Sequence, residues 1–285
     1  MSEAVHPSLL VVGCGDLGAA VADYFAQRDW SVHGVRRSVA KIPGVTMIAA
    51  DATQPETLKA LRTITPDYVL VALTPGEFSD QRYRAVYVDG ARNVLRALDT
   101  TRIKRVFWVS STSIYHQNDG EWVDENSPAH PSAFSGARLL EAERVIAASG
   151  LPHTSIRFGG IYGPGRERLL RQLRNGQRSA LTPPRFSNRI HRDDVVGVLQ
   201  FLIERAARGE TLQSLYLGVD TEPALMSDIE HWFSGYLQID YSTLTSDAPP
   251  ARGGSRRCNS ARLQALGYRF LYPTFREGLP TLLEG

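Results

Sequence analysis

Cysteine and lysine are scarce in this sequence of 285 residues, which has 2 cysteines and no lysine after Lys104. Cys14 and Cys258 belong to no CxxC pair or metal-ligand pattern, so we interpret both as small packing residues and expect no metal site. Long apolar runs are missing too, because no stretch approaches the roughly 20 residues that span a bilayer. The start, MSEAVHPSLLVV, lacks the basic residues and long apolar core of a signal peptide. We therefore expect a cytoplasmic protein without a membrane partner.

Neither sign of charge is in excess. The 32 lysines and arginines and the 30 acidic residues give a formal net charge of +2, which provides no general attraction for nucleic acid. The arginines are also hardly interleaved with aromatic residues, and we expect no nucleic-acid partner. Hydrophobic residues make up 42% of the chain, enough for a large core in one or two domains.

A glycine-spaced turn near the N-terminus is the most informative motif. Residues 9–12 are four consecutive aliphatic residues, typical of a strand buried on both faces, and residues 19–28 have helical spacing. Between them lie Gly13, Gly15 and Gly18. In this context the first glycine permits the tight turn, the second lets a pyrophosphate approach the backbone, and the third lets the helix pack against the strand. The motif predicts dinucleotide binding; an ordinary glycine turn is the alternative.

The second expected strand, residues 31–35, ends in Arg36, Arg37 and Ser38. A fold specific for NAD usually has an acid here that binds the ribose 2′-hydroxyl. Two guanidinium groups and a hydroxyl instead suit a 2′-phosphate, because arginine offers paired, charge-assisted donors. We expect NADP(H) to be preferred over NAD(H); two solvated arginines after a strand are the alternative.

Strands and helices alternate over about the first 110 residues. Strands are expected at residues 46–51, 67–73 and 105–110, and helices at residues 55–63 and 80–99. This alternation predicts an α/β fold with a doubly wound parallel sheet, a Rossmann fold. Asp51 is placed to meet the adenine amino group. The expected cofactor-binding residues are Gly13, Gly15, Asp16, Leu17, Gly18, Arg36, Arg37, Ser38, Asp51, Ala52, Leu73 and Thr74.

Several further blocks occur in an order known from one enzyme family. They are YVDGARNVLRAL at residues 87–98, VFWVSSTSIYH at 106–116, IRFGGIYGPG at 156–165 and RIHRDDVVGVL at 189–199. With the glycine turn and the C-terminal SARLQALGYRFLYPTFREGL, they cover nearly the whole chain. The sequence therefore resembles the extended short-chain dehydrogenases/reductases, with the NAD(P)-dependent epimerase/dehydratase group as the nearest branch.

The resemblance implies a catalytic triad of a serine or threonine, a tyrosine and a lysine four residues after the tyrosine. Ser111 matches the first position, where it would hydrogen-bond the reacting oxygen. Phe134 stands at the tyrosine position and Arg138 at the lysine position. Phenylalanine has no ionisable proton and arginine stays protonated, so the usual proton exchange cannot run through this pair. Arg138 is expected to hold the ribose of the cofactor.

The replacement of the family's tyrosine and lysine by Phe134 and Arg138 leaves two functions open. A substitute proton donor, namely Tyr115, Ser113 or Tyr162, would preserve catalysis. Loss of the proton-transfer role would leave a catalytically inactive NADP(H)-binding sensor or regulator. The glycine turn is one residue shorter than in typical extended enzymes, as in atypical members of the superfamily, several of which bind the cofactor without the standard triad.

A run of arginines follows Gly163, Pro164 and Gly165, which end a sixth expected strand. Eight arginines and one acid lie between residues 166 and 192, which suits either a solvated face or a pocket for an anionic ligand. The resemblance implies that nucleotide-diphosphate groups bind in this part of the chain. The candidate substrate-binding residues are Ser113, Arg166, Arg185, Arg189 and His191. A lone histidine is more often structural, and Asp193 or Asp194 is expected to cap the following helix.

The expected organisation is a nucleotide-binding domain at residues 1–160, to which residues 190–220 return, and a smaller substrate-binding subdomain at residues 161–189 and 221–285. A helix at residues 227–237 is expected to begin with a serine cap, and residues 246–254 are expected to form a loop. The resemblance also implies a homodimer formed through helices at residues 80–99 and 133–149. The leading hypothesis is an NADP(H)-dependent oxidoreductase or epimerase/dehydratase-like enzyme acting on a polar, anionic small molecule such as a nucleotide sugar.

Overall fold

A computed structural model describes residues 6–247 and 254–284. They form two compact units, each assembled from separate parts of the chain. The first unit contains the described residues up to Ser111, Phe134–Ile156 and Val196–Tyr216, and the second contains Thr112–Ala133, Arg157–Val195 and the described residues from Leu217 on. The domain boundaries expected from the sequence placed residues 112–133, 157–160, 190–195 and 217–220 in the first unit. Most of the loop expected at residues 246–254 lies outside the described residues.

The first unit is built on a seven-stranded sheet with the order β11-β7-β5-β4-β1-β2-β3. The strand pairs from β5 to β3 are all parallel. The continuous apolar runs of the sequence are typical of such parallel strands, because helices cover both faces of the sheet and both faces must then be apolar. The predicted doubly wound α/β sheet is confirmed. Its strands are β1 (Ser8–Val12), β2 (Ser31–Arg36), β3 (Val45–Ala49), β4 (Tyr68–Val71), β5 (Arg105–Ser111), β7 (His153–Phe158) and β11 (Leu215–Gly218).

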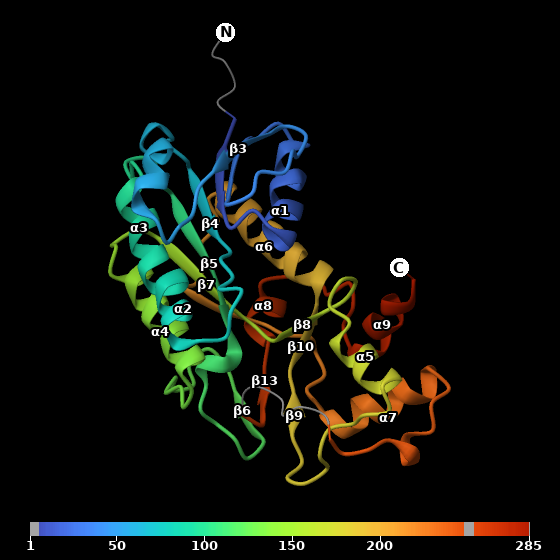
Figure 1. Cartoon of the computed structure of the whole chain (residues 1–285). Helices are drawn as coiled ribbons and strands as arrows, with labels where there is room; N and C mark the ends of the chain where they lie inside the picture. Colours follow the sequence, from blue (N-terminus) through green and yellow to red (C-terminus); the bar gives the residue numbers. More distant parts are fainter. Residues whose placement is uncertain (1–5, 248–253, 285) are drawn as a thin grey trace. The chain divides into compact units, whose positions relative to one another are not determined.

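Helices cover both faces of this sheet. Figure 1 shows α2, α3 and α4 on one side and α1 and α6 on the other. One core cluster lies beneath α3 and α4, from Leu10 and Val12 of β1 to Ala142 and Ile146 of α4. The helices are α1 (Asp16–Ala26), α2 (Asp80–Tyr83), α3 (Gly90–Ala97), α4 (Phe134–Ala147) and α6 (Arg192–Ala207).

Two of the predicted helices have a different form. Residues Pro55–Thr63 fold as the 3₁₀ helix η1, whose buried side chains are Leu58 and Leu61. This spacing of three suits a helix with three residues per turn, in which such side chains align. The helix expected at residues 80–99 runs from α2 to α3, but its middle, η2 (Arg84–Asp89), is a π-helix. Such a segment changes the direction in which the flanking side chains point.

The second unit consists of short strand pairs and short helices around its own core. In that core Leu170 and Leu173 pack with Phe233 and Phe275. The strand pairs are β6 (Glu121–Val123) with β13 (Arg256–Cys258), β8 (Gly160–Tyr162) with β10 (Arg189–His191), and β9 (Phe186–Ser187) with β12 (Ala224–Leu225). The helices are η3 (Thr112–Ile114), α5 (Arg168–Arg174), α7 (Met226–Tyr236), η4 (Tyr241–Thr243), α8 (Ala261–Ala265), α9 (Phe275–Gly278) and η5 (Leu279–Leu283).

One predicted helix cap is wrong, and one of the two residues expected to cap α6 has other partners. Helix α7 begins one residue before Ser227, with Leu225 at the N-cap position and no side-chain cap, so the predicted serine cap is wrong. Asp194 lies in the first turn of α6 but accepts hydrogen bonds from the backbone N–H groups of Leu271 and Tyr272 at 2.7 and 2.9 Å. Its carboxylate therefore fixes the C-terminal segment. No helix in residues 6–247 and 254–284 is both long and apolar enough to cross a membrane.

Candidate functional site

The glycine turn between β1 and α1 contains two glycines that the fold requires and one that it does not require. Gly13 has a positive φ of 89°, and a Cβ there would collide with the backbone of Ala72. A Cβ at Gly18 would lie 2.5 Å from the carbonyl oxygen of Gly13. At Gly15 a Cβ would meet nothing within 4 Å. The fold therefore explains two of the glycines, and the open space at Gly15 is the space that a ligand close to the backbone needs.

This turn borders a pocket of about 210 Å³ at the carboxyl ends of the parallel strands, where open α/β sheets bind their ligands. Nine of the predicted cofactor-binding residues line it: Gly13, Gly15, Arg36, Arg37, Ser38, Asp51, Ala52, Leu73 and Thr74. The other lining residues are Val12, Val35, Ala50, Thr53, Ala72, Arg82 and Val86. The predicted residues Asp16, Leu17, Gly18 and Arg138 are not among them.

The charges around the pocket are mostly positive. Arg36 and Arg37 form no hydrogen bond or ion pair with any residue that the structure describes. Asp51 is the one carboxylate among the lining residues and accepts hydrogen bonds at Oδ1 from the backbone and hydroxyl of Thr53, at 2.9 and 2.8 Å. Burial opposes its charge, but these hydrogen bonds and the nearby Arg37 and Arg82 lower the pKa of Asp51. The pocket thus holds an ionised carboxylate among three guanidinium groups.

Arg82 was not found from the sequence. It lies on α2, and its Nε donates a hydrogen bond of 3.0 Å to the carbonyl oxygen of Pro75, in the loop after β4. No hydrogen bond in the described part of the chain uses its Nη1 or Nη2. The helical pattern of residues 80–99 identified its element, but the motif gave no reason to place this arginine at the pocket.

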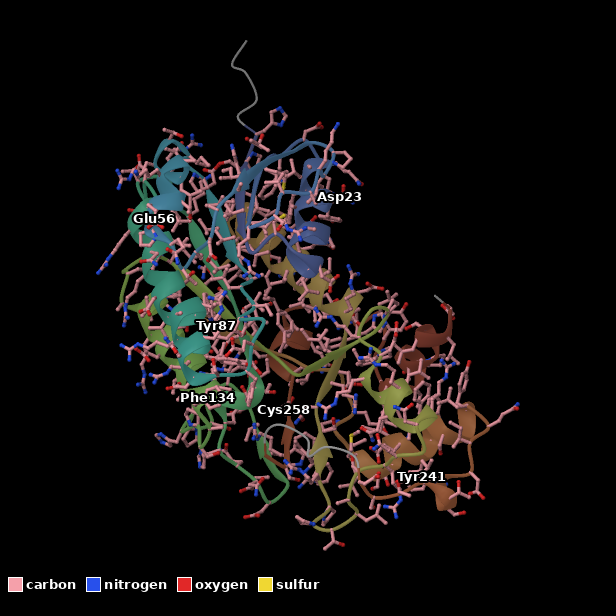
Figure 2. The ribbon with its side chains drawn as sticks, in the orientation of Figure 1. Asp23, Glu56, Tyr87, Phe134, Tyr241 and Cys258 are labelled. Atoms are coloured by element: carbon pink, nitrogen blue, oxygen red, sulfur yellow. The ribbon has the colours of Figure 1, made fainter. Side chains whose placement is uncertain are left out.

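Phe134, at the position of the catalytic tyrosine in the family that the sequence resembles, belongs to an aromatic cluster. Its ring lies 4.8 Å from that of Phe78 and 5.4 Å from that of Tyr83. Figure 2 labels Phe134 at the start of α4. The structure therefore has an apolar packing contact where the resemblance implies a proton donor.

Arg138, at the lysine position, is held by two carboxylates of the same unit. Its Nε and Nη2 donate to Asp80 at 2.7 and 2.9 Å, and its Nη1 donates to Glu141 at 2.9 Å. These hydrogen bonds raise the pKa of Arg138 further above its ordinary value. The bidentate contact joins α4 to α2, and ribose binding by Arg138 stays a prediction.

Ser111 is the last residue of β5 and is half-buried. The residue before it, Ser110, donates a hydrogen bond of 2.6 Å to the buried carboxylate of Glu143 on α4. This contact fixes the end of β5 against α4. The buried hydrogen bond of Ser110 therefore holds its neighbour Ser111 in position.

The proposed substitute donor Tyr115 is buried in the second unit. Its hydroxyl donates a hydrogen bond of 2.8 Å to the carbonyl oxygen of Asp124, and the guanidinium of Arg157 lies 4.9 Å from the centre of its ring. Burial raises the pKa of Tyr115 to about 12. In this structure the Tyr115 hydroxyl donates to a backbone carbonyl, and a catalytic role for Tyr115 stays a prediction.

His191 is fully buried in the same unit. Its Nδ1 accepts the backbone N–H of Asp193 at 3.2 Å, so Nε2 carries the proton and donates to the Thr281 hydroxyl at 3.0 Å. Burial lowers the pKa of His191. Both nitrogens are used inside the unit, as expected of a structural histidine.

The remaining candidates of the second unit lie on separate elements. Ser113 is in η3, Arg166 precedes α5, Arg185 precedes β9, and Arg189 begins β10. Within the described ranges no group of three or more His, Cys, Asp or Glu residues could hold a metal ion. Burial raises the pKa of Cys14 to about 11 and that of Cys258 to about 12, so neither thiol is an activated nucleophile.

Comparisons with known proteins agree with this geometry. A family model described as NAD(P)H-binding matches residues 13–205. A solved structure from Methylobacillus flagellatus, provisionally named NAD-dependent epimerase/dehydratase, is 35% identical, covers 98% of both chains and has a TM-score of 0.81. Protein YeeZ of Escherichia coli K12 is 27% identical over 92% of this chain and 95% of its own. WbmG of Bordetella bronchiseptica, solved with NAD and UDP, has a TM-score of 0.79 at 15% identity over 100% of this chain and 95% of its own, a similarity of fold alone.

Proposed function

The chain belongs to the NAD(P)H-binding family, and from this premise we propose that it is an NADP(H)-dependent oxidoreductase or epimerase/dehydratase-like enzyme. Its substrate would be a polar, anionic metabolite such as a nucleotide sugar. The single observation that carries the proposal is the pocket of the first unit, where Arg36, Arg37 and Arg82 surround one carboxylate at the carboxyl ends of the strands.

The preference for NADP(H) is supported by the charge and partners of these arginines. Arg36 and Arg37 have free donors among the described residues, and a 2′-phosphate offers the oxygens that a guanidinium fork binds best. Each such charge-assisted hydrogen bond contributes about 1.5–3 kcal/mol. NADH lacks this phosphate and would leave the donors without that partner.

The bound cofactor would supply hydride exchange, and the residues of the chain would supply position and charge. Gly15 leaves room for the pyrophosphate beside the backbone. Ser111, whose strand end is fixed through Ser110 and Glu143, would hydrogen-bond the reacting oxygen. The proton donor is unassigned, because Phe134 has no hydroxyl and the Tyr115 hydroxyl already donates a hydrogen bond to a backbone carbonyl.

The nucleotide-sugar part of the proposal is supported by the arginines of the second unit. Arg166, Arg185 and Arg189 lie in a segment with few acids, and guanidinium groups match phosphate oxygens. The presence of UDP in the Bordetella structure shows that this fold can hold a nucleotide diphosphate.

One observation favours the second candidate, an NADP(H)-binding sensor without turnover. Phe134 is packed against Phe78 and Tyr83, and Arg138 is held by Asp80 and Glu141. Both dyad positions therefore have structural roles that need no catalysis.

Two measurements on the purified chain test these candidates. In a fluorescence titration at one salt concentration, we expect NADPH to bind at least about tenfold more tightly than NADH, a difference of about 1.4 kcal/mol. Equal affinities would contradict the NADP(H) preference, and no binding of either would contradict the cofactor role. Single-turnover oxidation of bound NADPH with nucleotide sugars then separates an enzyme from a sensor, because a sensor oxidises none.

A further inference from the structure

Several carboxylates are buried among the described residues of the second unit, and Asp194 and Glu230 are fully used inside the protein. Asp194 accepts hydrogen bonds from the Tyr268 hydroxyl and two backbone N–H groups at 2.7–2.9 Å. Glu230 accepts from Gln172 at 2.6 Å and from the backbone and hydroxyl of Ser179 at 3.0 and 2.7 Å. Asp220 is equally buried, with 2% of its surface exposed, yet neither carboxyl oxygen forms a hydrogen bond of normal geometry with a residue that the structure describes. The backbone N–H of Glu222 is the one hydrogen-bond donor that influences its pKa. Such a group costs free energy unless something pairs with it.

Two other polar groups near Asp220 are also without suitable partners. The Tyr162 hydroxyl is buried and has no hydrogen-bond partner. The Nε of Arg189 has none either, and its Nη2 reaches only the sulfur of Met226, at 3.1 Å. Arg189 forms no ion pair with any described residue, although the charges of Arg189 and Asp220 influence each other. A guanidinium without an oxygen acceptor is as unusual as a carboxylate without a donor.

The pairing of two strands brings Arg189 and Tyr162 to one face, and the backbone N–H of Asp220 donates a hydrogen bond of 2.7 Å to the carbonyl oxygen of Arg189. In the parallel β8–β10 pair, Arg189 lies opposite Gly160, and His191 lies opposite Tyr162. Side chains two residues apart on a strand share a face, and the Tyr162 and His191 rings do meet there, 5.4 Å apart. Gly160 is exposed, and a Cβ on it would meet only the Asn188 carbonyl, at 3.4 Å. The face is therefore open beside Arg189 and closed at Tyr162.

The charge state of the cluster favours a negative ligand. Burial raises the pKa of Asp220 well above its usual range. A protonated Asp220 would be a neutral donor. Burial also lowers the pKa of Arg189, so a negative ligand beside its guanidinium would favour the charged form. Arg189, Tyr162 and protonated Asp220 are then three donors, which suits an oxygen-rich anion.

We propose that Arg189, Tyr162 and Asp220 form an internal site for a small oxyanion, a carboxylate or phosphate group, that enters beside Gly160. The proposal that this group is part of the substrate rests on the proposed function; the anion site itself does not. Arg189 supplies the charge, while Tyr162 and Asp220 are the neutral groups that position the oxyanion.

Inorganic phosphate is the probe for the test, and calorimetry of the full chain is the measurement. The parent protein carries Arg36→Ala and Arg37→Ala, which removes two of the three guanidinium groups of the cofactor pocket. We expect saturable phosphate binding that Arg189→Gln weakens at least tenfold. The matched control, Arg174→Gln, removes the same charge from an exposed position on α5 and leaves the affinity unchanged. Asp220→Asn retains binding, because a carboxamide also donates.

Stability measurements separate this site from an internal ion pair. Arg189 has no oxygen partner to lose, so we expect Arg189→Gln to lower the melting temperature by less than about 3 °C. No saturable phosphate binding, or the same affinity after Arg189→Gln, would mean that water alone fills the cluster and would overturn the proposal. A large loss of stability in Arg189→Gln and in Asp220→Asn, with no further loss in the double variant, would overturn it too.

An NADPH titration of the chain with Arg36 and Arg37 intact distinguishes the two proposals. NADPH binding without phosphate binding at Arg189 contradicts the anion site only. Phosphate binding at Arg189 without NADPH binding supports the anion site and contradicts the proposed function.

Discussion

At the scale of single residues, the glycine turn divides into positions required by the fold and a position required by the ligand. Gly13 needs its positive φ and its closeness to Ala72, and Gly18 needs its closeness to Gly13. Gly15 has neither need, because its surroundings are open to 4 Å and its φ is −94°. Substitutions at these glycines can therefore separate folding from binding.

We expect Gly15→Ala to fold with a melting temperature close to that of the wild type but to bind NADPH at least about tenfold more weakly, because the added methyl group occupies the space of the pyrophosphate. Gly13→Ala is the contrasting variant, because its Cβ collides with the Ala72 backbone and the positive φ adds strain. Thermal melts and NADPH titrations check both. Unchanged NADPH binding by Gly15→Ala would show that the turn does not hold the cofactor.

Arg82 is the pocket residue that the sequence motif did not identify. We predict that Arg82→Ala weakens NADPH binding by about 1.5–3 kcal/mol, the contribution of hydrogen bonds to a charged group, and weakens NADH binding less. Arg84→Ala is the control, because Arg84 lies two residues further on and does not line the pocket. Paired titrations with both cofactors measure the difference. Equal losses for Arg82→Ala and Arg84→Ala would indicate an effect of overall charge only.

At the scale of elements, the start of β4 is tied to the start of β1 by a buried carboxylate. Asp67, next to β4, accepts hydrogen bonds from the backbone and hydroxyl of Ser8 at 3.0 and 2.8 Å, and Lys104 lies 3.2 Å away. Burial disfavours the charge of Asp67, but these partners outweigh burial and lower its pKa. One side chain thus fixes the register of two neighbouring parallel strands.

The pH dependence of stability follows from the direction of this shift. A carboxyl group with a lower pKa in the folded state stabilises the fold above its unfolded pKa, about 3.8, and loses that contribution as the pH falls through the folded value. We expect Asp67→Asn to lower the free energy of unfolding by about 1–2 kcal/mol at pH 7 and to have less effect below pH ~3.5. Urea unfolding at several pH values measures this. Asp23→Asn on α1 (Figure 2) is the control. If Asp67→Asn lowered the free energy of unfolding equally at all pH values, the interpretation would be contradicted.

The second element-level feature is the contact between α2 and α4. The bidentate bond from Arg138 to Asp80 and the ring contacts of Phe134 join the two helices. The positions that the resemblance assigns to catalysis are therefore used here to fix helices. A tyrosine and a lysine placed there together, Phe134→Tyr with Arg138→Lys, would restore the family's groups at the expense of this contact.

At the scale of the whole molecule, the first unit carries a surface hollow that bears on the predicted homodimer. A hollow of about 550 Å³ lies along α3 and α4, the helices through which the resemblance implies pairing. Apolar residues and arginines both line it, together with three other polar residues; the lining is Leu95, Val145, Ala148, Leu151, Arg92, Arg96, Arg144, Thr100, Glu141 and Ser149. A stable interface buries about 800 Å² per partner, and an apolar floor with a polar rim is its usual composition.

We predict that the wild-type chain sediments as a dimer and that Val145→Asp converts it to a monomer, because an unpaired carboxylate would be buried at the centre of the contact. Leu271→Asp places the same charge on an exposed leucine of the second unit and is expected to leave the dimer intact. Sedimentation velocity over a range of concentrations measures both. A monomeric wild type, or a dimer that survives Val145→Asp, would contradict pairing through α3 and α4.

The sequence by itself determined the parts of this protein that depend on neighbouring residues. The buried strands, the turn from β1 to α1 and the arginines after β2 follow from apolar runs and motif spacing, and nine predicted residues line one pocket as a result. The tertiary structure alone decided which distant side chains meet. The pairing of Arg138 with Asp80 spans 58 residues. Arg82 reaches the pocket through the fold of its helix. Among the described residues, neither carboxyl oxygen of Asp220 forms a hydrogen bond of normal geometry. The physical reason is that local pattern fixes conformation and burial, whereas the partner of a polar group depends on packing between remote elements.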